Sequence, residues 1–200
     1  ELARWLESDR LGYLLETLDQ EKLTNQQDVV RNERRQSYEN RPYGVAGMSI
    51  VAALYPPEHP YHWMTIGAAE DLKAARLEDV RAFFQTYYRP RNASLSIAGD
   101  IDAGRAVALA TDYFGDFEPG PEPPPVVAPN AAVAGETRLV LEDRVELSRL
   151  YLAWHSPALF AEDDAELDLV SEVLGGGKTS RLYRSLVYEQ RIATEIAASQ

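Results

Sequence analysis

Six prolines lie between residues 115 and 129, and this stretch constrains the fold more than any other part of the chain. They are Pro119, Pro121, Pro123, Pro124, Pro125 and Pro129. Proline fixes φ and donates no backbone hydrogen bond, so the stretch cannot form a regular helix or a central strand and is extended and semi-rigid. We therefore predict one domain over residues 1–118, a linker over 119–136 and a second domain from 137 to 200.

Periodic patterns flank the linker on both sides. Apolar residues at helical spacing predict helices over residues 2–18, 23–40, 45–54, 77–88, 103–114, 163–174 and 181–188. Alternation of apolar and polar residues predicts strands over 93–98, 137–142 and 149–155, and a further strand starting near 192. Helices interleaved with strands predict an α+β fold.

Composition excludes several classes of protein. The 200 residues hold 20 Lys and Arg against 32 Asp and Glu, a net charge of −12. This charge argues against binding to nucleic acid or to an anionic membrane surface, because each requires a basic face. It has no cysteine, so disulfides and thiolate metal sites are impossible. No apolar run approaches the length of a membrane span. The sequence begins at Glu1 within a helical pattern, without a signal peptide, so we expect a piece of a longer or processed protein.

The helix predicted over residues 23–40 carries an acidic residue on its apolar face. We expect Thr24 or Asn25 to cap its start, and the pair before Pro42 to end it. Glu33 follows Val29 by four residues, which places the carboxylate on the same face as the valine. Gln26 precedes Glu33 by two helical turns and is almost in line with it.

Two interpretations of Glu33 follow from this pattern. Most helix glutamates are solvated, and the arginines beside this one are typical of a wet surface. Alternatively, Glu33 faces inward and is held there by a cation, because a buried carboxylate needs such a partner. A metal ion is the simplest cation of this kind.

Several motifs resemble the M16 metallopeptidases, the family of pitrilysin, insulinase and the mitochondrial processing peptidase. They are WLESDRLG at 5–12, VVRNERRQS at 29–37, NRPYG at 40–44, YYRPRNA at 87–93, AGD at 98–100, and GGG at 175–177 with SRL at 180–182. They occur in family order along the whole chain. The resemblance implies M16-type (LuxS/MPP-like) α+β domains, each an antiparallel sheet with helices packed on one side. The chain would hold the later part of a first domain and the opening part of a second.

The resemblance also implies a zinc cofactor and a role for Glu33. In this family an H-x-x-E-H motif supplies two histidine ligands and the glutamate that activates water. A glutamate on a later helix completes the ligand set, and Glu33 matches that position. The chain contains no H-x-x-E-H, so we expect this motif upstream of Glu1 and expect these 200 residues alone to be inactive. Gln26 stands where many relatives have a second glutamate, and it would lie beside the ligands without binding the metal.

The second segment departs from the family pattern. Active members carry an arginine and a tyrosine that grip the substrate backbone, and Val187 and Thr194 stand at those positions here. We therefore expect a zinc endopeptidase that cleaves peptides in a closed chamber and works with a second M16 subunit or a second half of a longer chain. Relatives of this type are often exported to the periplasm, although a cytoplasmic location is also compatible.

Other interpretations stay open at this level. A non-catalytic M16-like subunit would keep the fold and bind substrate, and an acidic binding module unrelated to proteolysis would need Glu33 to be exposed away from any cleft. His59 and His62 do not have the spacing of a helical zinc pair, so packing and loop hydrogen bonds explain them better. We give no catalytic role to His155.

Overall fold

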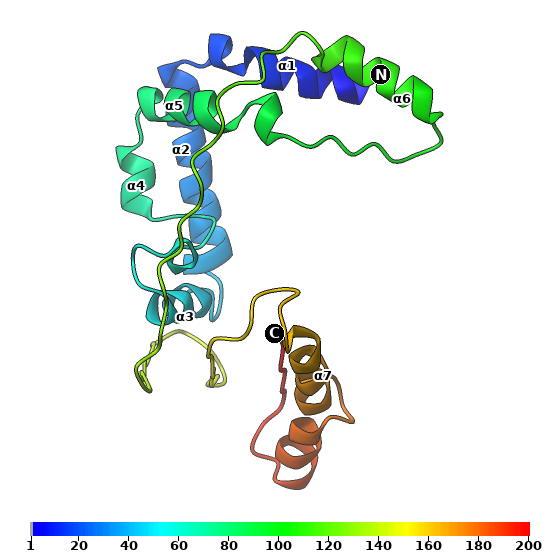
Figure 1. Cartoon of the computed structure of the whole chain (residues 1–200). Helices are drawn as coiled ribbons and strands as arrows, with labels where there is room; N and C mark the ends of the chain where they lie inside the picture. The colour runs from blue at the N-terminus through cyan, green and yellow to red at the C-terminus, as the bar shows by residue number, and fades with distance from the viewer. Residues whose placement is uncertain (1) are drawn as a thin grey trace. The chain divides into compact units, whose positions relative to one another are not determined.

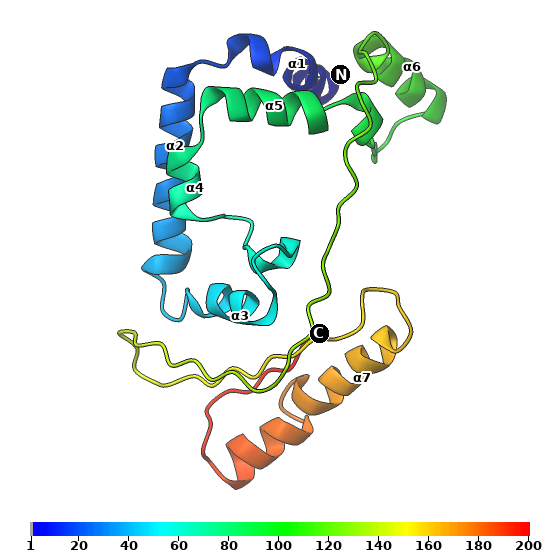
Figure 2. The same ribbon diagram turned by 60° about the vertical axis from the view of Figure 1, so that its left-hand side comes forward.

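The computed structural model describes residues 2–200, and all regular elements within that range are helical (Figures 1 and 2). In chain order they are α1 (Leu2–Thr17), α2 (Gln20–Arg34), η1 (Arg35–Glu39), α3 (Ala46–Leu54), η2 (Pro60–His62), α4 (Ala69–Ala74), α5 (Leu77–Tyr87), η3 (Pro90–Asn92), α6 (Ala103–Phe114), α7 (Asp164–Gly175) and η4 (Tyr183–Glu189). The predicted start of the first domain at Glu1 lies outside the described residues. The helices α1, α3, α5, α6 and α7 begin and end within one residue of the positions that the apolar spacing predicts.

The chain forms two compact units that divide between Arg149 and Leu150. This division falls after the proline-rich stretch, which is extended and belongs to the first unit. The domain ranges inferred from the sequence stay a prediction.

The expected antiparallel sheet is wrong for residues 2–200, which contain helices and extended segments but no strand. The segments 93–98, 137–142 and 149–155 are extended, yet none lies in a hydrogen-bonded ladder with another. Their apolar side chains are also uncovered: Val140 is 91% exposed, and both of its leucine neighbours are exposed as well. Alternation predicts a strand only where a second strand satisfies the backbone and a packed layer covers one face. Within the described residues neither condition is met.

In the first unit, α1 packs against α6 and the segment that follows it. The rings of Tyr13 and Phe117 meet edge to face, with their centroids 6.3 Å apart. A Cβ on Gly12 would approach the Phe117 ring within 2.6 Å, so this position in α1 requires a glycine for the close contact. Arg81 of α5 donates to the carbonyl of Leu18 at 3.0 Å, which ties α5 to the turn between α1 and α2.

The start of α2 is capped by Asp19, not by Thr24 or Asn25 as the sequence suggested. The Asp19 carboxylate accepts from the Lys22 N–H at 2.8 Å. The backbone hydrogen bond from Lys22 holds the pKa of Asp19 below its ordinary value. The helix therefore begins one turn earlier than predicted, because an aspartate cap was available there.

The C-terminal end of this long helix widens into the π-helical turn η1, and the chain then turns sharply at Tyr43. Tyr43 has a left-handed backbone, with φ of 60°, which is uncommon for a residue with a side chain. Three contacts with residues about a hundred positions later hold it. Its N–H donates to Asp143 at 2.9 Å, its hydroxyl donates to the carbonyl of Leu147 at 2.6 Å, and the guanidinium of Arg149 lies 4.1 Å from its ring centre. Tyr43 thus anchors the last segment of the first unit.

The second unit consists of α7, η4 and the extended segments around them. Asp164, at the start of α7, is buried and accepts hydrogen bonds from the Phe160 N–H and from the Gln200 side chain. Gly175, at the other end of α7, has no room for a Cβ, because the backbone of Ala198 passes against it. The expected strand near 192–198 is instead an extended segment in contact with the end of α7.

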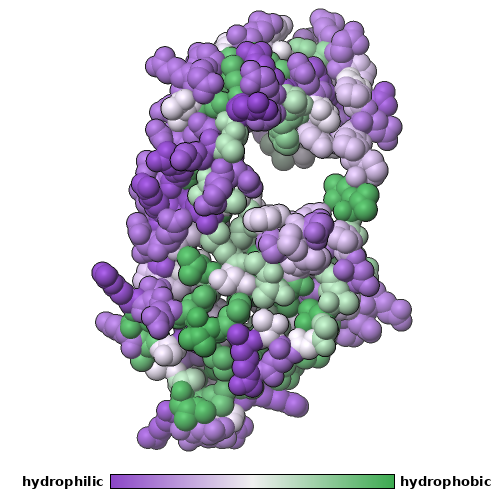
Figure 3. Space-filling model, turned by 90° about the vertical axis from the view of Figure 1, so that its left-hand side faces the viewer, coloured by the Kyte–Doolittle hydropathy of each residue, from purple (hydrophilic) through white to green (hydrophobic). Residues whose placement is uncertain are grey.

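Much apolar surface stays exposed in both units. Among the described residues, the buried apolar side chains are those of Leu23, Ala46 and Leu109. The helix Ala46–Leu54 consists mostly of apolar residues, yet only its first residue, Ala46, is fully buried. Hydrophobic side chains are visible at the surface on the face that Figure 3 shows. None of the helices in residues 2–200 combines the length and the apolar character needed to cross a bilayer.

Candidate functional site

One face of α2 packs against other segments of the first unit. Leu23, Gln27, Val30 and Arg34 recur at helical spacing and are the residues of α2 that are buried or half-buried. Gln27 donates from one amide nitrogen to the carbonyls of Leu72 and Ala75, each at 2.9 Å, and so docks α2 onto the end of α4. We call these four residues the packed face of α2.

The three residues singled out by the sequence pattern lie on another side of the same helix. Gln26, Val29 and Glu33 are spaced by three and four residues and are all exposed, and we call them the open face of α2. Val29 is 49% exposed. The expectation that Glu33 points into the interior is therefore wrong for the described residues. The physical reason is that the valines do not share one environment: Val30 turns toward the packed face, and Val29 remains on the open face.

Glu33 has no ion-pair partner within residues 2–200, unlike Asp28 and Glu39, the acidic residues nearest to it in the sequence. Asp28 pairs with Arg31 at 3.0 Å, and Glu39 pairs with Arg34 at 2.9 Å. No ion pair or hydrogen bond within residues 2–200 involves the Glu33 carboxylate. The side chain of Gln26 makes no hydrogen bond within the same described residues either. The open face therefore presents one free carboxylate and one free amide, both held on a regular helix.

The described residues do not supply a complete zinc site. No group of three or more His, Cys, Asp or Glu side chains within residues 2–200 is arranged to hold a metal ion. A hydrolytic zinc site needs three protein ligands and an open position. Glu33 can supply one oxygen ligand, so the residues present fit one ligand position and not the whole set.

The histidines near η2 are used locally, as the loop interpretation predicted. His59 is buried, and its Nδ1 accepts from the Tyr61 N–H at 3.0 Å. The Nδ1 of His62 lies 2.6 Å from the carbonyl of Tyr55, so this nitrogen carries the proton and donates it. His59 and His62 therefore stabilise the loop.

The positions of the missing substrate-gripping pair lie in the second unit. Val187 is half-buried within η4, and Thr194 is exposed in the segment after it. Neither side chain carries the charge or the phenol that the family pattern provides there. Val187 and Thr194 belong to the second unit, and Glu33 belongs to the first.

The residue that positions the candidate ligand was not among those that the sequence pattern indicated. Gln27, and not Gln26, makes the long-range hydrogen bonds that fix the rotation of α2 and thereby the direction of Glu33. The signal was present in the spacing, because Leu23, Val30 and Arg34 lie on the same side of the helix as Gln27. The partners of Gln27, about 45 residues later, had no signature in the sequence.

Comparison with known proteins gives a consistent picture. A family model described as the Peptidase M16 inactive domain matches residues 74–200. The zinc protease PqqE of Helicobacter pylori is 30% identical over 181 residues, which cover 89% of this chain and 40% of that protein. An uncharacterized zinc protease of Mycobacterium leprae is 28% identical over 165 residues, covering 78% of this chain and 37% of the relative.

A solved structure is also similar. The crystal structure of a protease from Helicobacter pylori superimposes with a TM-score of 0.74 at 26% identity. The match covers 97% of this chain and 47% of the solved chain. The chain thus spans less than half the length of the relatives to which it is similar.

Proposed function

Because the chain belongs to the M16 peptidase family, we propose that the protein is a zinc-dependent endopeptidase that hydrolyses peptides in an enclosed chamber. The observation that carries this proposal is the free carboxylate of Glu33, on a helix whose sequence resembles the family's ligand helix. Both relatives described above are named zinc proteases, which supports the same chemistry for the whole protein.

In this proposal Glu33 supplies the third protein ligand and Gln26 lies beside it. The two histidines and the water-activating glutamate must come from residues other than these 200, because the sequence has no H-x-x-E-H. When bound, zinc would polarise the peptide carbonyl and lower the pKa of a bound water. The part of Glu33 is to hold the metal from a fixed direction, and the packed face of α2 sets that direction. These 200 residues alone would neither bind zinc tightly nor cleave peptides.

A non-catalytic M16-like subunit is the second candidate, and a specific observation favours it. The family model that matches residues 74–200 is that of an inactive domain, and Val187 and Thr194 replace the substrate-gripping pair. In either case we propose that a second M16 subunit, or the second half of a longer chain, completes the peptide-binding chamber. Export to the periplasm stays a prediction.

Zinc content and peptidase activity of the full-length protein test the proposal. We expect Glu33→Gln to lose stoichiometric zinc and to lower kcat/KM by more than about 100-fold, since even residues that only orient ligands cost 10–100-fold. Glu21→Gln, an exposed carboxylate on the same helix, is the matched control and should change neither quantity. Unchanged zinc content and activity in Glu33→Gln would exclude Glu33 as a ligand. A full-length protein that binds no zinc and remains inactive with its partner subunit would favour the non-catalytic candidate.

A further inference from the structure

The loop between α3 and α4 contains a buried histidine that the proposed peptidase chemistry does not use. We call residues 55–63, which include η2, the η2 loop. His59 is 9% exposed, whereas Glu58 and Pro60 on either side of it are exposed. A polar ring buried in a loop that is otherwise open needs a hydrogen bond that compensates for its lost hydration.

The hydrogen bond of His59 determines which of its ring nitrogens carries the proton. Its Nδ1 lies 3.0 Å from the backbone nitrogen of Tyr61, and an amide N–H can only donate. Nδ1 is therefore unprotonated, and the neutral ring carries its hydrogen on Nε2. The same hydrogen bond caps the start of η2. His62 differs, because its Nδ1 donates to the carbonyl of Tyr55 and keeps that proton in both charge states.

Two tyrosine rings contact His59 within the η2 loop. The ring centroids of Tyr55 and Tyr61 lie 4.6 and 5.4 Å from that of His59. Glu58 is exposed, and no ion pair within residues 2–200 joins His59 to a carboxylate. A proton added to Nδ1 would remove the acceptor of the Tyr61 N–H and would leave a buried charge without an anionic partner. The tyrosine rings offer a face to such a cation but no acceptor for its second N–H.

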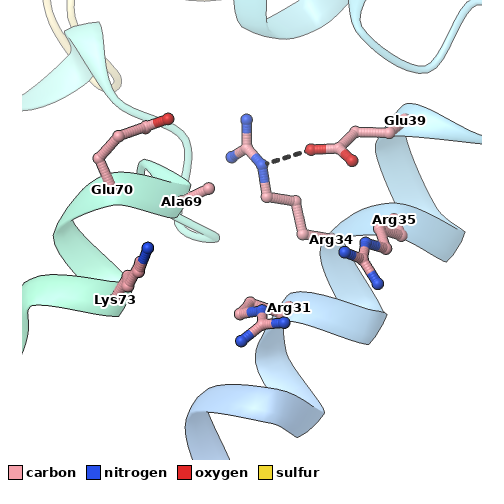
Figure 4. A pocket seen from close by; sticks show the side chains of 7 residues that line it. All are labelled: Arg31, Arg34, Arg35, Glu39, Ala69, Glu70 and Lys73. Carbon is pink, nitrogen blue, oxygen red and sulfur yellow. Dashed lines mark hydrogen bonds and ion pairs between the residues drawn. The ribbon is translucent and has the colours of Figure 1, made fainter.

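The η2 loop also forms part of the wall of a cavity of about 270 Å³. His62 and Trp63 line this cavity from the loop, and Arg34 lines it from α2. Arg34 is held by its ion pair with Glu39 at 2.9 Å (Figure 4). The indole N–H of Trp63 donates to the carbonyl of Pro57 at 3.1 Å, so the loop side of the wall depends on bonds within the loop itself.

We propose that His59 is a pH-sensitive latch, which keeps the η2 loop closed when neutral and releases the loop, and with it that side of the cavity, when protonated. Histidine ordinarily changes charge between pH 5 and 8. The order of the loop is therefore present at the upper end of this range and is lost as the pH falls. The latch needs no zinc, and its existence does not depend on the proposed peptidase activity.

Hydrogen–deuterium exchange of the full-length protein, measured by mass spectrometry at pH 8 and pH 5.5 and corrected for the intrinsic effect of pH on exchange, tests the latch. We expect the protection of peptides that cover the η2 loop to be about tenfold lower at pH 5.5, the size expected for one lost hydrogen bond. Peptides from α6, which contains no histidine, are the internal control and should keep their protection. An equal fall in α6 would show general acid destabilisation and would overturn the proposal, as would an unchanged η2 loop.

Three variants separate the titration of His59 from its packing. His59→Asn keeps a side-chain acceptor suited to a cap but does not titrate, so the loop should stay protected at both pH values. His59→Phe keeps a ring beside the tyrosines but accepts nothing, so protection should be low at both. His62→Gln, the matched control, should retain the pH dependence of the parent. The latch is excluded if His59→Asn keeps that dependence, if His62→Gln abolishes it, or if His59→Phe is as protected as the parent at pH 8.

Discussion

The two faces of α2 lie on the same helix but differ in their contacts: the packed face contacts other segments of the first unit, and the open face is exposed. The packed face holds Leu23, Gln27, Val30 and Arg34, and two of these four are polar or charged. The open face holds Gln26, Val29 and Glu33, and its valine is half exposed. Polarity therefore does not distinguish the face that packs from the face that stays free. The difference is in the partners: Gln27 and Arg34 find backbone carbonyls in the segments around α4, which compensates their burial.

The strongest test of this comparison substitutes the apolar residue on each face. Leu23 is 7% exposed, so Leu23→Ala should lower the free energy of unfolding by about 2–3 kcal/mol through lost burial and a partly filled cavity. Val29→Ala removes a side chain that is already wet and should cost about 0.5 kcal/mol or less. Urea denaturation of the 200-residue chain measures both. Equal losses in the two variants would mean that the open face is covered in solution.

The adjacent arginines at the end of α2 and the start of η1 give a second, smaller contrast. Arg34→Gln leaves Glu39 and the carbonyl of Gly67 without their donor, and we expect a cost of about 1–2 kcal/mol because Glu39 remains partly solvated. Arg35→Gln, at the next position, breaks no contact within the described residues and should be neutral to about 0.5 kcal/mol. Thermal unfolding of the two variants under identical salt checks the difference. A neutral Arg34→Gln would contradict its place on the packed face.

The two adjacent glutamines provide a closely matched pair. Gln27→Ala removes two hydrogen bonds to the end of α4 and should cost about 1 kcal/mol, since the site is only half buried. Gln26→Ala should be nearly silent in stability. Hydrogen exchange at Ala75 and its neighbours is the sharper measurement, because Gln27→Ala should speed exchange there while Gln26→Ala should not. A larger effect from Gln26→Ala would reverse our assignment of the faces.

The smallest expected effect on stability concerns Asp19, the N-cap residue of α2. The pKa of Asp19 is lowered in the folded chain, chiefly by the Lys22 N–H, so the stabilising contribution of this carboxylate is present above its unfolded pKa of about 4. It is lost as the pH falls through the lower folded value. Thermal unfolding followed from pH 5 downward should show a smaller loss of stability in Asp19→Asn than in the parent chain. Asparagine keeps the cap without titrating, so an unchanged pH dependence would exclude this role.

Local signals predicted the helices well and the strands poorly. The helix ending before Pro42 could be read from the residues themselves, since the proline stops it by a steric clash with its neighbour. The alternation at 137–142 was equally clear, yet Val140 and its neighbours have no ladder within residues 2–200. A helix satisfies its backbone within one segment, whereas a strand depends on a second segment that its own sequence does not specify.

The sequence by itself determined where the helices lie, which classes of partner the charge disfavours, and, through motifs in order, the family. Only the tertiary structure decided which side of α2 packs and where Glu33 points. The apolar residues of α2 are too few to indicate which face packs, because the helix contains only two adjacent valines and a single buried leucine. The choice is made by the carbonyls of Leu72, Ala75 and Gly67, backbone groups that every sequence has and that only the folded chain brings into reach of Gln27 and Arg34.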